Sequence, residues 1–106
     1  MVREVSPGSV AARLAAGEAL VLLDVREPWE IEIASLPNTV RIPMGEIQGR
    51  YGELSPAAPT VVLCRSGARS RQVAGFLESR GFAAVDNLTG GILAWGAELD
   101  PSLPAY

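Results

Sequence analysis

The chain has 106 residues, of which 48% are apolar and 20% charged, a composition typical of one globular domain. Its net charge of −3 gives no reason to expect binding to nucleic acid. The longest apolar run, Ala19–Leu23, is too short to cross a membrane, and the N-terminus lacks the apolar core of a signal peptide. We therefore expect one domain over residues 1–106, with Met1–Val5 and Asp100–Tyr106 peripheral and no contact with a membrane.

Cys64 is the only cysteine, so no internal disulfide can form, and a reducing compartment, the cytoplasm, is expected. The chain contains no histidine, and all nine basic residues are arginine. A Cys–His pair, a histidine-based triad and a histidine metal site are therefore excluded. Any activation of Cys64 must come from arginine, backbone amides or a helix end, and we expect neither a metal nor a cofactor.

The first half of the chain alternates strand and helix signals. Arg3-Glu4-Val5 is compatible with a brief edge strand, and Ser6 followed by Pro7 predicts a helix over Pro7–Ala16. Ala19–Val25 is continuously apolar, as in a strand covered on both faces. It closes on Asp24, which is either a turn residue or part of a site at the carboxyl edge of the sheet.

Pro28 suits the start of a short helix, in which Trp29, Ile31 and Ile33 are expected to pack inward. Arg26, Glu27 and Glu30 are close enough to form local ion pairs. A short strand at 39–42 and a broken helix over Met44–Leu54 follow, because Gly49 and Gly52 interrupt the helical spacing.

Val61-Val62-Leu63 reads as a buried strand, and a helical stripe after residue 70 ends at Gly81. We expect a further strand over Phe82–Val85, a turn at Asp86-Asn87 and a last helix after Gly90-Gly91. The alternation predicts an α/β fold with a central, mostly parallel sheet of about four or five strands and helices on both faces.

Cys64 lies where the strand passes into a polar loop and a helix. Amides of such a loop tend to converge on one point and, with the helix dipole, favour an anion there, including a thiolate. Gly67 allows close approach of the backbone, and Arg65 and Arg69 can contact an oxyanion. A buried, inert thiol is the alternative, but the Cys-Arg-Ser-Gly-x-Arg context disfavours it.

Two anion chemistries fit such a loop. Cysteine phosphatases commonly place five residues between the cysteine and the closing arginine, whereas four separate Cys64 from Arg69, which is followed by Ser70. The tighter loop leaves room for a sulfur atom on Cys64 rather than for a phosphate. There is also no obvious general acid outside the loop.

The chain resembles a single-domain rhodanese, a sulfurtransferase, in "LLDVREPWEIEIASLPNTVRIP", "VVLCRSGARS" and "NLTGGILAWG". The resemblance implies a rhodanese-like domain in which Cys64 takes the outer sulfur of a donor such as thiosulfate and becomes a persulfide. An acceptor, which is cyanide in an assay and a thiol or sulfur-carrier protein in the cell, then receives the sulfur. The implied substrate-binding loop is formed by Arg65, Ser66, Gly67, Ala68 and Arg69. The implied supporting residues are Asp24, Arg26, Glu30, which is the candidate partner of Arg26, and Ser70.

Two positions depart from the family pattern. Ser35-Leu36-Pro37-Asn38 stands where a His-Pro stretch is common, a variant similar to rhodanese modules of enzymes that load sulfur-carrier proteins. Ala68 replaces a longer polar or basic side chain, which removes one contact to the donor. The remaining alternatives are a phosphatase or arsenate reductase of the same fold and a non-catalytic, sulfur-carrying binding module.

Overall fold

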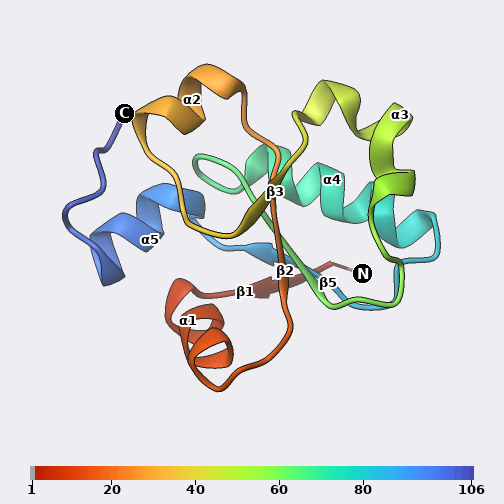
Figure 1. Cartoon of the computed structure of the whole chain (residues 1–106), viewed down its shortest axis with the longest axis horizontal. Coiled ribbons are helices and arrows are strands. Elements are labelled where there is room, and N and C mark those ends of the chain that lie inside the picture. The colour runs from red at the N-terminus through yellow and green to blue at the C-terminus, as the bar shows by residue number, and fades with distance from the viewer. Residues whose placement is uncertain (1) are drawn as a thin grey trace.

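Five parallel strands form one sheet in a computed structural model that describes residues 2–106; Met1, in the segment expected to be peripheral, lies outside the described residues. The sheet order is β1-β5-β4-β2-β3 (Figure 1). The strands are β1 (Arg3–Val5), β2 (Val21–Asp24), β3 (Thr39–Arg41), β4 (Thr60–Leu63) and β5 (Val85–Leu88). All four strand pairings are parallel. The predicted α/β class and parallel sheet are confirmed.

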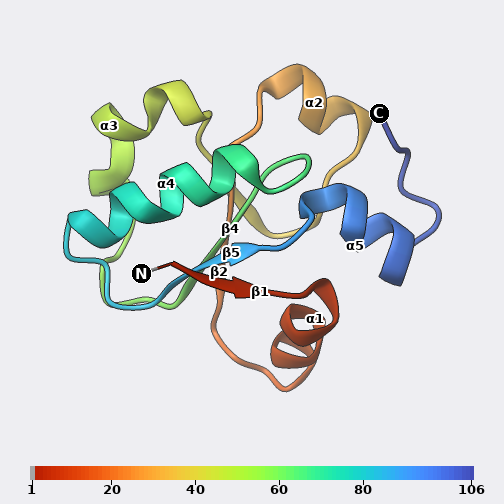
Figure 2. The same ribbon diagram turned by 180° about the vertical axis from the view of Figure 1, so that it is seen from behind.

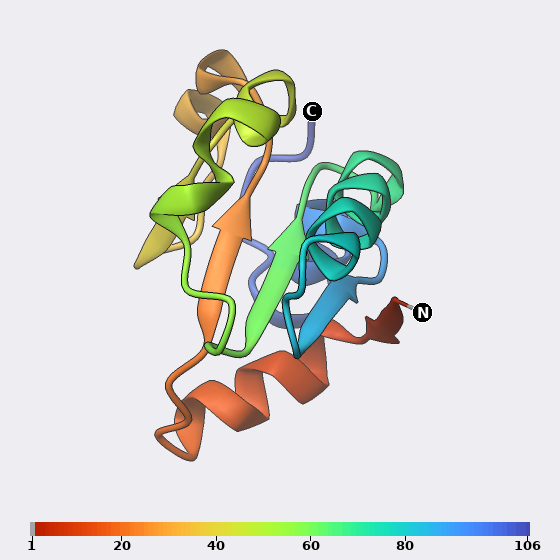
Figure 3. The ribbon, with the colours of Figure 1, turned by 90° about the vertical axis from the view of Figure 1, so that its right-hand side faces the viewer.

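Helices connect the strands and cover both faces of the sheet. They are α1 (Pro7–Ala15), α2 (Pro28–Ile33), α3 (Ile47–Arg50), α4 (Ala68–Ser79) and α5 (Gly91–Leu99). Short 3₁₀ turns at Met44–Glu46 and Tyr51–Glu53 flank α3, which confirms the expected broken helix. Figure 2 shows α1 beside β1 at one end of the sheet and α2 at the other, and Figure 3 shows α4 in front of the strands and α5 behind them.

The central strand β4 shows why the apolar run is continuous. Val62 and Cys64 belong to the core layer beneath α3 and α4, whereas Val61 and Leu63 pack with residues of α1 and α5. All four side chains are buried. Alternate residues from Val61 to Cys64, the residue after β4, therefore pack into cores on opposite faces of the sheet, as expected for a strand covered on both faces.

The position of β5 differs from the sequence prediction. The strand covers Val85–Leu88 instead of Phe82–Val85, so Asp86 and Asn87 lie in the sheet and not in a turn. Their polar side chains are tolerated because they are hydrogen-bonded: Asp86 accepts from Arg3, and Asn87 donates to Glu4.

The expectation that Trp29 and Ile33 pack inward is also wrong, since they are 59% and 41% exposed. Helix α2 has only six residues, and the side chain it buries is the charged Glu30. The Glu30 carboxylate can point inward because it forms hydrogen bonds with residues of the site described below.

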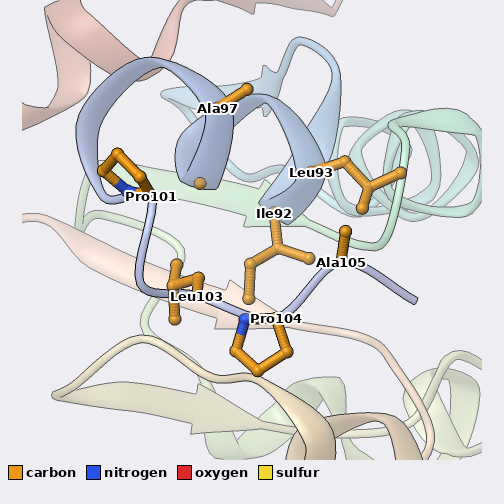
Figure 4. Close-up of a pocket in the computed structure, with 8 residues that line it drawn as sticks. Ile92, Leu93, Ala97, Pro101, Leu103, Pro104 and Ala105 are labelled. Carbon is orange, nitrogen blue, oxygen red and sulfur yellow. The ribbon is translucent and has the colours of Figure 1, made fainter.

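The segment after α5 is non-helical, as expected, and folds back along that helix. Pro101, Leu103 and Pro104 line an apolar crevice of about 290 Å³ together with residues of α5, and Ile92 points toward Leu103 and Pro104 (Figure 4). This packing brings the end of the chain toward α2 and the loop after β4 (Figure 1). Among the described residues, no helix is long and apolar enough to traverse a bilayer.

Candidate active site

Cys64 follows directly after β4 at the carboxyl edge of the sheet, and its thiol is free. Cys64 is buried, with only 1% of the residue exposed. The chain then turns through Arg65–Gly67, and α4 begins at Ala68. Gly67 has a φ of +110°, a conformation that side chains other than that of glycine rarely adopt, so the turn depends on this residue.

Polar hydrogens surround the Cys64 sulfur. The Gly67 N–H donates to Sγ at 3.1 Å, and the Ser70 hydroxyl lies 3.3 Å from it. Burial by itself raises the pKa of the Cys64 thiol. The Ser70 hydroxyl and the backbone N–H groups of Ser70, Gly67 and Ser66 outweigh that effect, so the pKa lies below its usual value. The loop thus favours a thiolate without any histidine.

The carbonyl groups of the loop are turned away from this anion site. The carbonyl oxygens of Cys64 and Arg65 accept hydrogen bonds from the N–H groups of Ile92 at 2.9 Å and Leu93 at 3.2 Å. Gly91 makes this approach possible, because a Cβ there would lie 2.4 Å from both oxygens. The start of α5 therefore holds the loop so that amides, not carbonyls, face the sulfur.

Arg69 is joined to Glu30 by two hydrogen bonds of 2.7 and 2.8 Å. The same buried carboxylate accepts from the Glu27 N–H and from the Tyr106 hydroxyl, each at 2.8 Å. The Arg69 guanidinium, in spite of burial, lowers the pKa of Glu30 to about 2. The charge of Arg69 is therefore already balanced, while about a third of its side chain stays exposed.

Asp24 and Arg26 form a second ion pair in which both side chains are fully buried. Arg26 Nη2 donates to Asp24 Oδ2 at 2.7 Å and to the carbonyl of Ala34 at 2.8 Å. The implied pairing of Arg26 with the Glu30 carboxylate is wrong, since Arg26 reaches only the Glu30 carbonyl oxygen, at 3.3 Å. Asp24 is two residues away in the chain, and Arg69 occupies the Glu30 carboxylate.

Arg65 is held by the end of the described chain. Its guanidinium donates to the backbone oxygen of Tyr106 and lies over the Tyr106 ring, 5.2 Å from the centroid. The Tyr106 hydroxyl also accepts from Arg26 at 3.1 Å. The exposed Trp29 meets the same ring edge-on. Tyr106, expected to be peripheral, thus contacts three of the predicted site residues.

A cavity of about 580 Å³ opens beside Arg69. Its other lining residues are Val25, Glu27, Met44, Gly45 and Gln48. Through Arg69, in the first turn of α4, the cavity adjoins the end of the cysteine loop.

The structure brings the predicted site residues together in two groups. Gly67 and Ser70 contact the Cys64 sulfur, and the side chains of Ser66 and Ala68 are exposed. The ion-paired residues lie behind or beside the loop: Asp24, Arg26, Glu30 and Arg69. Sequence reasoning missed Asn87, Gly91 and Tyr106. The Asn-Leu-Thr-Gly-Gly stretch carried a signal for the first two, as polar and glycine positions after an apolar run, whereas nothing local marks Tyr106.

A cysteine in an amide-lined loop at the edge of a parallel sheet is an arrangement suited to a nucleophilic thiolate. The family model described as the rhodanese-like domain matches residues 6–98. The chain belongs to this family.

Relatives agree with this assignment. A sulfurtransferase of Allochromatium vinosum is 41% identical over 95 residues, covering 90% of this chain and 89% of that protein. The chloroplastic rhodanese-like/PpiC domain-containing protein 12 of Arabidopsis thaliana is 49% identical over 90 residues. The match covers 80% of this chain but 30% of that longer protein. A rhodanese-like domain protein from Staphylococcus aureus has a TM-score of 0.86 at 26% identity, with 99% of both chains covered.

Further relatives carry names that join an adenylyltransferase to a sulfurtransferase. One solved structure with this fold is described as a possible tyrosine phosphatase; at 24% identity it bears on the fold alone. The relatives support sulfur transfer as the general activity of this chain.

Proposed function

We propose that the protein is a sulfurtransferase that works through a persulfide on Cys64. The Cys64 thiolate attacks the outer sulfur of a donor such as thiosulfate, a new S–S bond forms, and the donor's S–S bond breaks with release of sulfite. The thiolate electron pair becomes the new S–S bond and the old bonding pair leaves with sulfite as a dianion, so the outer sulfur keeps its own negative charge in the persulfide. The observation that carries the proposal is the hydrogen bond from the Gly67 N–H to the Cys64 sulfur, at 3.1 Å, with the Ser70 hydroxyl next to the same sulfur.

The arrangement of the arginines supports a small, sulfur-sized anion at the cysteine. In a phosphatase loop, free guanidinium donors are needed for the phosphate oxygens. Here Arg69 is bound by Glu30 and Arg65 by Tyr106, whereas backbone amides such as the Gly67 N–H are the donors directed at the sulfur. A persulfide sulfur requires fewer donors than a phosphate dianion.

The second half-reaction returns the cysteine to its thiolate. An acceptor nucleophile bonds to the outer sulfur of the persulfide, and the S–S bond electrons return to Cys64. Cyanide serves as acceptor in an assay, and a thiol or a sulfur-carrier protein in the cell. The cavity beside Arg69 supports a protein acceptor, and the single cysteine supports a reducing compartment such as the cytoplasm.

Mass spectrometry of the intact chain after thiosulfate treatment tests the proposal. The wild type should gain the mass of one sulfur atom and release one equivalent of sulfite, and cyanide should then remove the sulfur as thiocyanate. Cys64→Ser is the control and should do neither. A sulfur adduct on Cys64→Ser would overturn the assignment, as would hydrolysis of an aryl phosphate at a rate comparable to sulfur transfer.

A further inference from the structure

The buried Ser70 hydroxyl has more acceptors than protons. Its Oγ lies 3.3 Å from the Cys64 sulfur, 3.2 Å from the Gly67 carbonyl oxygen and 2.5 Å from Oδ1 of Asn87. A hydroxyl donates one hydrogen bond. The residue is completely buried, so water does not supply a second donor. The direction of this one proton therefore decides whether the sulfur receives a hydrogen bond from Ser70.

The amide of Asn87 has only one orientation that satisfies its neighbours. Its nitrogen faces the Gly67 carbonyl oxygen at 3.1 Å and the carboxylate oxygens of Glu4 at 3.0 and 3.2 Å. Both partners are acceptors only, so the nitrogen must point to them and Oδ1 must point to Ser70. Because Oδ1 cannot donate, the short contact is satisfied only when Ser70 donates to Asn87.

We propose that Asn87 is a positioning residue that competes with the Cys64 sulfur for the single proton of the Ser70 hydroxyl. With a neutral thiol, Ser70 donates to Asn87. When the sulfur is ionised, its charge draws the proton into a stronger, charge-assisted hydrogen bond, and Asn87 loses its donor. This inference refines the proposed function, since it concerns how readily the nucleophile of that reaction forms.

Because of this competition, Asn87 disfavours formation of the Cys64 thiolate. Removal of its acceptor frees the Ser70 proton for the sulfur and should favour the thiolate, but only while Ser70 is present. The other charged side chains around the loop are not substituted in this comparison: Arg65, Arg69 with Glu30 on α2, the Asp24–Arg26 pair at the end of β2, and Glu4 with Arg71 on the β1 side.

Asn87→Leu is a suitable substitution because the partners of Asn87 keep other donors. The Gly67 carbonyl oxygen still accepts from the Arg71 N–H at 3.2 Å. Glu4 still accepts from Arg71 Nε at 2.9 Å and from the Thr89 hydroxyl at 3.0 Å. Asn87→Val, with a β-branched side chain suited to a strand, is the second variant should the leucine variant fail to fold, as judged by circular dichroism.

The test is a double-mutant cycle on the thiol pKa, read from the pH dependence of alkylation of the full chain by iodoacetamide. The four proteins are wild type, Asn87→Leu, Ser70→Ala and the double variant. Asn87→Leu should lower the pKa of the Cys64 thiol more when Ser70 is present than in the Ser70→Ala background. The difference between the two pKa shifts should be about half to one pH unit. The subtraction removes the general effect of a more apolar neighbour.

A difference of zero, or a larger decrease in the Ser70→Ala background, would overturn the proposal and leave Asn87 a purely structural residue. Alkylation requires neither sulfur donor nor acceptor. The result is therefore independent of whether thiosulfate is a substrate, and failure of the proposed function would appear only in the mass and sulfite measurements.

Discussion

Arg69 and Glu30 are joined through the two terminal guanidinium nitrogens, Nη1 and Nη2, 2.7 and 2.8 Å from the two carboxylate oxygens, although they lie 39 residues apart in the chain. This pair links the first turn of α4 to α2. It therefore connects the cysteine loop to the segment that follows β2.

Glu30→Gln should weaken this link. Because Arg69 is about a third exposed and can be solvated in the variant, we expect a loss of about 1–2 kcal/mol of unfolding free energy at neutral pH, measured by urea denaturation. The folded-state pKa of Glu30, about 2, is lower than its unfolded value, so the contribution is complete above the unfolded pKa and disappears as the pH falls toward 2. The difference in unfolding free energy between wild type and Glu30→Gln should therefore decrease as the pH falls. A difference that stays constant down to pH 2 would contradict this account.

Asp24→Asn should be more damaging than Glu30→Gln. Arg26 would keep a fully buried charge without its carboxylate partner, which typically costs about 3–5 kcal/mol. Replacement of both residues by leucine should cost less than Asp24→Asn alone, because the buried Arg26 charge is then no longer left without a partner. Guanidinium chloride unfolding of the three proteins checks the order, and a double variant less stable than Asp24→Asn would refute it.

Gly91→Ala should disrupt the loop. The new Cβ would lie 2.4 Å from two backbone oxygens, and the φ of +61° is unfavourable for alanine. We expect loss of at least 2 kcal/mol of stability and a large decrease in persulfide formation. Gly49→Ala in α3 is the matched control, since a Cβ there meets nothing within 4 Å, and it should be neutral or slightly stabilising.

The rate of persulfide formation should follow a single ionisation, that of the Cys64 thiol. The chain has no histidine, and Cys64 is its only thiol. Because the pKa of Cys64 lies below its usual value, the rate should rise with pH and reach its plateau at a lower pH than for a free cysteine. Ser70→Ala removes one of the hydrogen bonds that lower this pKa and should move the rise to higher pH. Stopped-flow measurement of sulfite release over a pH series provides the check.

The cysteine loop was predictable because its determinants are local. A buried strand, a thiol, a glycine with positive φ and a helix start follow one another within 61–68. The strand β5 was misplaced for the opposite reason. Asp86 and Asn87 look like turn residues until their partners Arg3 and Glu4, 83 positions earlier, are brought beside them by the sheet.

The ion-pair partners of the supporting residues could not be predicted from the sequence either. The sequence placed Arg26 and Glu30 close together, which suggested an ion pair between them. The actual partner of Glu30 lies on α4, and Arg26 is enclosed by Asp24, Ala34 and Tyr106. Only the fold determines which of several nearby charges meet.

The contact of α5 with the loop carbonyls couples the size of the anion site to a helix that never touches the sulfur. An extra residue between Cys64 and Arg69 would give the spacing of a phosphatase loop. It would also displace the Arg65 carbonyl from the N–H of Leu93 and from the close approach at Gly91. Conversion of this scaffold from sulfur to phosphate chemistry therefore requires two coordinated changes, a longer loop and a shifted start of α5. An insertion in the loop alone would be expected to lose the old activity without creating the new one.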